Sequence, residues 1–62
     1  MSIPPMDMLR TCQMQFQAYA REHQAKADDF NNPPAYRERA ASRAKVNQKM
    51  ADDIQATLDE WG

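Results

Sequence analysis

Apolar residues recur every three or four positions along most of the chain, and two pairs of prolines divide this pattern into two segments. The pairs stand at positions 4–5 and 33–34. Proline fits the first turn of an α-helix and is excluded from its interior. The pattern therefore predicts one helix over residues 4–28 and a second over residues 33–60.

Residues 29–32 form a short polar segment between the two predicted helices. A connection this short favours antiparallel neighbours. Asn31 or Asn32 is the expected N-cap of the second helix, because asparagine accepts a hydrogen bond from free backbone amides. The chain is thus predicted to be one all-α domain, residues 1–62, folded as an antiparallel two-helix hairpin.

A buried stripe is predicted along the second helix, at the alternating steps of three and four that mark a heptad seam. It consists of Arg37, Ala40, Ala44, Asn47, Ala51, Ile54, Leu58 and Trp61. Alanines in its first half allow the helix axes to approach closely. A buried amide must be paired, so we expect Asn47 to fix the register of an assembly.

The matching stripe of the first helix is less regular. It is predicted to comprise Leu9, Cys12, Phe16, Tyr19, His23 and Lys26 or Ala27. Phe16 and Tyr19 are expected near Ala44 and Asn47, large residues against small ones. Met8 and Met14 point away from this stripe, and methionine suits an adaptable contact between subunits.

Chain length favours self-association. A chain of 62 residues buries only about 60 % of its unfolded surface when it folds. One cysteine, Cys12, cannot form an internal disulfide, and Cys12 with His23 lacks the four ligands of a structural zinc site. No metal or cofactor is expected. We therefore predict a homo-oligomeric helical bundle. Its contacts are predicted to include Met8, Met14, Asn47, Ile54 and Leu58.

Charges along the second helix run against its own dipole. Basic residues come first, at Arg37, Arg39, Arg43, Lys45 and Lys49, and acidic residues follow, at Asp52, Asp53, Asp59 and Glu60. A helix is positive at its N-terminus and negative at its C-terminus. Two copies packed antiparallel would set each basic half against an acidic half. For Arg39, Lys45 and Lys49, a solvated face with salt bridges at helical spacing is the simpler explanation.

A ligand offers another explanation for the basic start of this helix. Arg37 and Arg43 lie on or beside the stripe, close to Tyr36 and to the amides of the first turn. Arginine forks, free amides and an aromatic ring suit a planar anion such as a nucleotide. The end of the first helix adds Lys26 and His23. We therefore predict a ligand site of Tyr36, Arg37, Arg43, Lys26 and His23, completed by oligomerisation.

Several functional classes are not expected. The sequence has no glycine-rich phosphate loop, no HExxH motif and no nucleophile elbow, so a non-enzymatic protein is predicted. The start, MSIPPMDMLR, has no basic region followed by an apolar run, and no segment approaches membrane-spanning length. A cytoplasmic protein without a membrane partner is expected. The net charge of −1 argues against nucleic acid as the partner.

The predicted architecture resembles that of a class of small phage-encoded proteins. These proteins sequester the immune signals of the bacterial CBASS and Thoeris defences. The shared features are a helical hairpin spanning the chain, the lack of a catalytic motif, and the basic-then-acidic helix PPAYRERAASRAKVNQKMADDI. The resemblance implies an oligomeric sponge for a cyclic nucleotide or related signal, acting in the host cytoplasm.

The alternative is a small helical adaptor or inhibitor. Such a protein would lay an apolar face into a groove of a host protein. The candidate face contains Met6, Met8, Met14 and Phe16.

Overall fold

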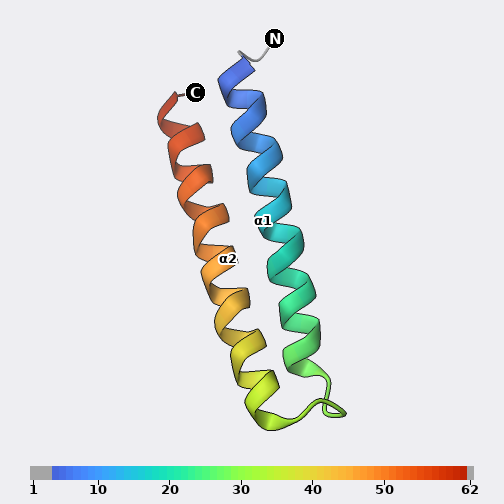
Figure 1. Cartoon of the computed structure of the whole chain (residues 1–62). Coiled ribbons are helices and arrows are strands. Elements are labelled where there is room, and N and C mark those ends of the chain that lie inside the picture. Colours follow the sequence, from blue (N-terminus) through green and yellow to red (C-terminus); the bar gives the residue numbers. More distant parts are fainter. Residues whose placement is uncertain (1–3, 62) are drawn as a thin grey trace.

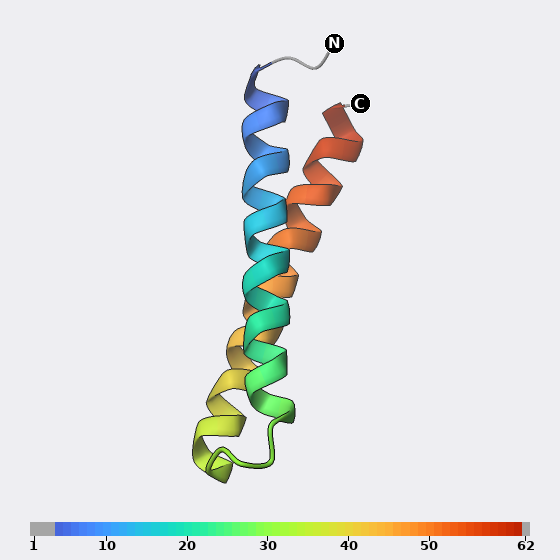
Figure 2. The same cartoon turned by 90° about the vertical axis from the view of Figure 1, so that its right-hand side faces the viewer.

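The computed structural model describes residues 4–61, which form two long helices joined by a tight turn (Figure 1). Helix α1 spans Pro4–Asp28 and helix α2 spans Pro34–Trp61. The predicted all-α hairpin is confirmed, and the second helix lies one residue later at each end than predicted. The helices run side by side and cross at a shallow angle (Figure 2). Within the described residues, neither helix contains a stretch long and apolar enough to cross a membrane.

Side chains close the turn between the helices. The carboxylate of Asp29 accepts a hydrogen bond from the N–H of Asn31 at 2.9 Å, and its carbonyl accepts one from the N–H of Asn32 at 3.0 Å. The Asn32 amide donates to the carbonyl of Lys26 at 3.0 Å, one of the final carbonyls of α1 that lack a partner within the helix. No residue between 4 and 61 has a positive φ. The C-terminus of α1 is therefore capped by side chains, without the left-handed residue that ends many helices.

The N-cap of α2 is Pro33, so the prediction of Asn31 or Asn32 at this position is wrong. The N–H of Arg37 donates to the carbonyl of Pro33 at 3.0 Å, which is the first hydrogen bond of the helix. Pro34 takes the first helical position, where its fixed φ fits and its missing N–H costs little. Asn32 is held at the end of α1 instead.

The contact between the helices is built mainly from alanine. Its buried residues are Ala20, Ala27, Ala40, Ala44, Ala51 and Leu58. The predicted seam of α2 is confirmed from Arg37 to Leu58, whose members are buried or half-buried, but Trp61 is 52 % exposed. Five alanines and one leucine bury little apolar area, so the hydrophobic driving force of a single hairpin is small.

The stripe that helix α1 turns toward α2 matches the predicted one in part. Leu9, Phe16 and His23 are half-buried as predicted, and at the last position Ala27, not Lys26, is the buried residue. Cys12 and Tyr19 are exposed, so their predicted place in the stripe is wrong. The places of these two are taken by Gln13 and Ala20, and Met6 extends the stripe by one turn toward the N-terminus. Alanine allows a closer approach than tyrosine. The polar member is satisfied, because Nε2 of Gln13 donates to Oε1 of Gln55 across the contact at 2.6 Å.

Three pairs of residues fix the antiparallel register. These are Arg37 with Ala27, Ala44 with Ala20, and Gln55 with Gln13. Ala44 therefore lies close to another small residue, Ala20, and Tyr19, one of the two large residues predicted beside it, is 51 % exposed. Small residues on both helices bring the axes together at this level.

Candidate functional site

The side chain of Arg37 makes its contacts within the hairpin. Its Nε donates to the carbonyl of Ala27 at 2.8 Å, and its Cζ lies 4.3 Å from the centre of the Phe30 ring. Phe30 is 85 % exposed, so the guanidinium is an important packing partner for this ring. These contacts fasten the start of α2 to the end of α1.

The position of Arg37 explains part of the reversed charge order. The basic start of α2 lies beside the C-terminal end of α1 (Figure 1). That end carries partial negative charge, so a cation that is unfavourable in its own helix is favourable to the neighbouring one. The charges of α1 suit its dipole, with Asp7 in the first turn and Lys26 in the last. The first turn of α2 has no acidic residue.

Replacing Arg37 by alanine should destabilise the hairpin by roughly 1–2 kcal/mol, because a hydrogen bond and a cation–π contact are lost together. Arg37→Lys keeps the charge but loses the planar guanidinium, and should recover less than half of this loss. Urea unfolding followed by circular dichroism at one protein concentration measures both. The exposed Arg10 provides the control, because Arg10→Ala should change stability by no more than about 0.5 kcal/mol. Equal losses at the two arginines would contradict the structural role of Arg37.

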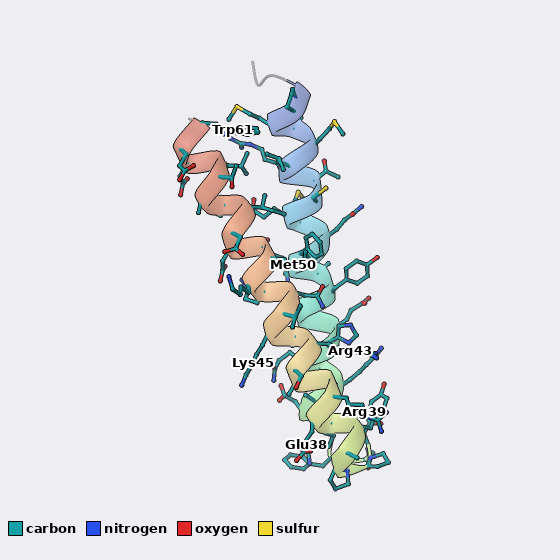
Figure 3. All side chains as sticks on the ribbon, turned by 60° about the vertical axis from the view of Figure 1, so that its left-hand side comes forward. Glu38, Arg39, Arg43, Lys45, Met50 and Trp61 are labelled. Atoms are coloured by element: carbon teal, nitrogen blue, oxygen red, sulfur yellow. The ribbon has the colours of Figure 1, made fainter. Side chains whose placement is uncertain are left out.

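Two of the predicted ligand residues share one side of α2 near the turn. Tyr36 and Arg43 lie two helical turns apart, with Arg39 between them at helical spacing. Figure 3 shows Arg39 and Arg43 extending to the same side of α2, while Lys45 extends to the other. All three residues of this line are exposed, and the two arginines border a shallow depression with Ser42.

The end of α1 brings two more predicted ligand residues to this region. By the register of the hairpin, Lys26 lies level with Arg39 and His23 lies level with Arg43. Lys26 is exposed and His23 is half-buried. The helical phases place the flank of α1 with Lys26 and the flank of α2 with Arg39 on the same broad side.

The structure thus gathers four predicted ligand residues and turns one away. Tyr36, Arg43, Lys26 and His23 lie toward the turn on one side of the hairpin, whereas Arg37 is directed to Ala27 and Phe30. The sequence pattern predicts Arg39 on a solvated face, outside the ligand site. Its spacing of four from Arg43 and three from Tyr36 is the signal that could have included it.

Large hydrophobic side chains lie exposed at mid-length on the same broad side. Val46 is 60 % exposed, Tyr19 is 51 % exposed and Met50 is 45 % exposed. On α2, Val46 and Met50 continue the line of Arg39 and Arg43 at steps of four and three. We call this side the mixed face. It comprises Met8, Cys12, Gln15, Tyr19, Glu22 and Lys26 of α1, and Tyr36, Arg39, Arg43, Val46, Met50, Asp53, Thr57 and Glu60 of α2.

The opposite broad side is lined by glutamine, and we call it the glutamine face. It comprises Arg10, Met14, Gln17, Arg21, Gln24, Lys45, Gln48, Asp52 and Gln55. Three of its glutamines donate to an acidic residue one turn later, each at 2.9 Å: Gln24 to Asp28, Gln48 to Asp52, and Gln55 to Asp59. Its exposed large hydrophobic residue is Met14, at 67 %. The two sides therefore differ, because the mixed face groups Tyr19, Val46 and Met50 at mid-length, whereas the glutamine face has Met14 there.

Residues predicted to join subunits fall into two groups. Leu58 is buried inside the hairpin, and Asn47 and Ile54 are half-buried in the same seam. The amide of Asn47 donates to the carbonyl of Arg43 in its own helix at 2.8 Å. Met8 and Met14 are 70 % and 67 % exposed, on different sides of α1. The hairpin itself uses the seam residues, and a role for any of the five between subunits stays a prediction.

The remaining chemistry of the described residues is sparse. Within residues 4–61, no group of three His, Cys, Asp or Glu side chains converges as a metal site requires. Cys12 is an exposed free thiol. The only salt bridge of this part of the chain joins Lys49 to Asp53 at 3.0 Å, so the arginines of the mixed face carry charge without an ion-pair partner.

No family model, curated protein or solved structure matches the chain. Its distinguishing feature is the mixed face, which combines exposed apolar residues at mid-length with basic residues near the turn.

Proposed function

We propose that the protein is a non-enzymatic interaction module, a small helical adaptor or inhibitor that presents its mixed face to another protein. The observation that supports this best is the exposure of Tyr19, Val46 and Met50 together at mid-length. Apolar residues grouped on a surface and rimmed by polar ones mark interaction sites. A pair of anchors at i and i+4 on one helix suits packing against a partner helix or groove.

The proposed contact lies elsewhere than the methionine-rich face expected from the sequence. Met6 and Phe16 are half-buried between the helices. Met8 and Met14 are exposed but separated by about 120° around α1, six residues apart. Val46 and Met50 extend the same face as Tyr19, so they form a more continuous contact than the methionines of α1.

A capture experiment with matched variants tests this function. Full-length protein is immobilised and exposed to an extract of the cells that express it, and retained proteins are identified by mass spectrometry. Val46→Glu should reduce capture by at least about tenfold, because a charge at the centre of an apolar contact cannot be paired there. Met14→Glu places the same charge on the glutamine face and should leave capture unchanged. Capture that survives Val46→Glu, or that both variants abolish while remaining helical, would contradict the proposal.

One observation favours a second function, sequestration of a small anionic nucleotide-like signal by an oligomer. Tyr36, Arg43 and Lys26 share the turn end of the mixed face, and the half-buried His23 lies beside them. In this proposal Arg39 takes the place of Arg37, and the two exposed arginines hold phosphate while Tyr36 stacks on a base. This is the role of the phage-encoded sponge proteins that the chain resembles in architecture.

A ligand that binds only the folded state raises its stability, by about 2.7 kcal/mol at a hundred times its dissociation constant. Thermal unfolding with a panel of cyclic dinucleotides and NAD-derived nucleotides tests the second function. One compound should raise the unfolding temperature, and the Arg39→Glu, Arg43→Glu double variant should abolish the rise. A rise that persists in the double variant, or no rise with any compound in the panel, would count against this site.

A further inference from the structure

We infer that the mixed face is covered by a second copy of this chain, in a two-fold dimer whose turns lie at opposite ends. The inference rests on the proposed function, because it concerns the same surface: a second copy covers the mixed face of the free protein, and another protein would bind there by displacing that copy. It stands on the order of residues along both helices and on the distribution of charge.

The row of α2 residues on the mixed face matches a second, antiparallel copy of the same row. In order, it reads Tyr36, Arg39, Arg43, Val46, Met50, Asp53, Thr57 and Glu60. Two antiparallel copies centred between Val46 and Met50 place each Val46 against Met50 of the second copy. Arg43 then comes opposite Asp53 of the second copy. Apolar groups meet at the centre and opposite charges meet beside them.

Helix α1 pairs with α1 of the second copy about the same two-fold axis. Its line on the mixed face reads Met8, Cys12, Gln15, Tyr19, Glu22 and Lys26, and the register sets the middle of this line level with the middle of the α2 line. When the α1 row of the second copy runs antiparallel about this midpoint, Gln15 meets Tyr19 of the second copy. Met8 meets the aliphatic stem of Lys26 of the second copy. One axis therefore accommodates both helices, as a rigid pair of hairpins requires.

Charge distribution selects between the two ways of stacking hairpins face to face. Residues 21–45, the half nearer the turn, contain six Lys and Arg against four Asp and Glu, whereas the rest of the chain contains two against five. With the turns at the same end, like-charged halves would lie on each other. With the turns at opposite ends, each positive half covers a negative one. Only the second arrangement is electrostatically complementary.

The small core of the hairpin favours association, and the mixed face is large enough for a second copy. Its own buried residues are five alanines and a leucine, and a small core of this kind is commonly completed by association. A standard interface takes about 800 Å² from each partner, roughly a sixth of the 4855 Å² surface of the chain. The mixed face follows the 46 Å long axis. Lys49 and Asp53 are 75 % and 66 % exposed, so their salt bridge is weak and leaves Asp53 able to meet an arginine.

A charge swap in the full-length protein tests the pairing of Arg43 with Asp53. Sedimentation equilibrium over a concentration series gives the dissociation constant of the dimer at low salt. Arg43→Asp or Asp53→Arg alone should raise it at least about tenfold, because each creates two like-charge contacts across the axis. The double variant should return it to within about threefold of the original. Arg21→Asp, the same charge change on the glutamine face, is the control and should leave it within about threefold.

The apolar centre is tested in the same way. Val46→Glu should give a helical monomer at concentrations where the original chain is dimeric, and Met14→Glu should remain a dimer. A wild-type chain that stays monomeric at every concentration overturns the inference, as does a dimer that Val46→Glu leaves intact or a double swap that fails to restore association. A monomeric wild type whose capture of another protein still depends on Val46 refutes the dimer alone and leaves the proposed function standing.

Discussion

Leu58→Ala is expected to destabilise the hairpin by about 2–4 kcal/mol, toward the lower part of the range for buried leucines. Leu58 is 5 % exposed and is the one large side chain among the buried residues of positions 4–61. A chain of this size has little stability in reserve, so the variant should be largely unfolded near room temperature. Urea unfolding followed by circular dichroism, at one protein concentration, measures the loss.

Met14→Ala is the matched control for Leu58→Ala. Met14 is 67 % exposed on the glutamine face, and its truncation should change stability by no more than about 0.5 kcal/mol. If Leu58→Ala were as mild as this control, the hairpin contact near the termini would not form as described.

Ala51→Leu is expected to be nearly as damaging, for the opposite reason. Ala51 has 0 % exposure, so three additional carbons must push the helices apart or adopt a strained rotamer, at a cost of about 1–3 kcal/mol. Ala56→Leu makes the same change at an exposed position of the same helix, where the two residues differ little in helix propensity. Thermal unfolding should therefore separate the two variants by several degrees. Similar unfolding temperatures would contradict the close approach of the helices at Ala51.

Much of the fold could be predicted because the signals are local. Paired prolines mark the helix starts, and the alanine-rich stripe of α2 follows from its spacing alone. The stripe of α1 could not be settled in this way. Leu9, Phe16 and His23 form one row of the stripe, and the residues on either side of this row could complete it. Hydrophobicity favours Cys12 and Tyr19 for that second row over Gln13. The choice is decided by the fit of Ala20 and Ala27 and by the bond from Gln13 to Gln55.

The role of Arg37 lies beyond what a single helix can show. Its charge opposes the dipole of α2, and only the hairpin brings it to the carbonyl of Ala27 and to the Phe30 ring. The same limit applies to Asn32, which caps the preceding helix and not the following one. Contacts between segments depend on register, which sequence periodicity leaves free.

The ligand proposal and the dimer proposal both use the arginines of the mixed face. A nucleotide-like anion and Asp53 of a second copy would compete for Arg43. Raising the salt concentration weakens both interactions, so salt alone cannot tell them apart. The charge swap of Arg43 with Asp53 distinguishes the two interactions, because it restores a charge pair between copies but cannot restore an anion site.

The distance between the two turns is the most direct test of the dimer and of the surface that forms it. Asn31 is exposed and contributes its backbone N–H, not its side chain, to the turn, so Asn31→Cys in a Cys12→Ser background provides one spin-label site per chain. With the turns at opposite ends, pulsed electron paramagnetic resonance should give a label separation approaching the 46 Å length of the hairpin. A separation comparable to its 15 Å width, or no dipolar coupling at concentrations well above the dissociation constant measured by sedimentation, would contradict the proposed assembly.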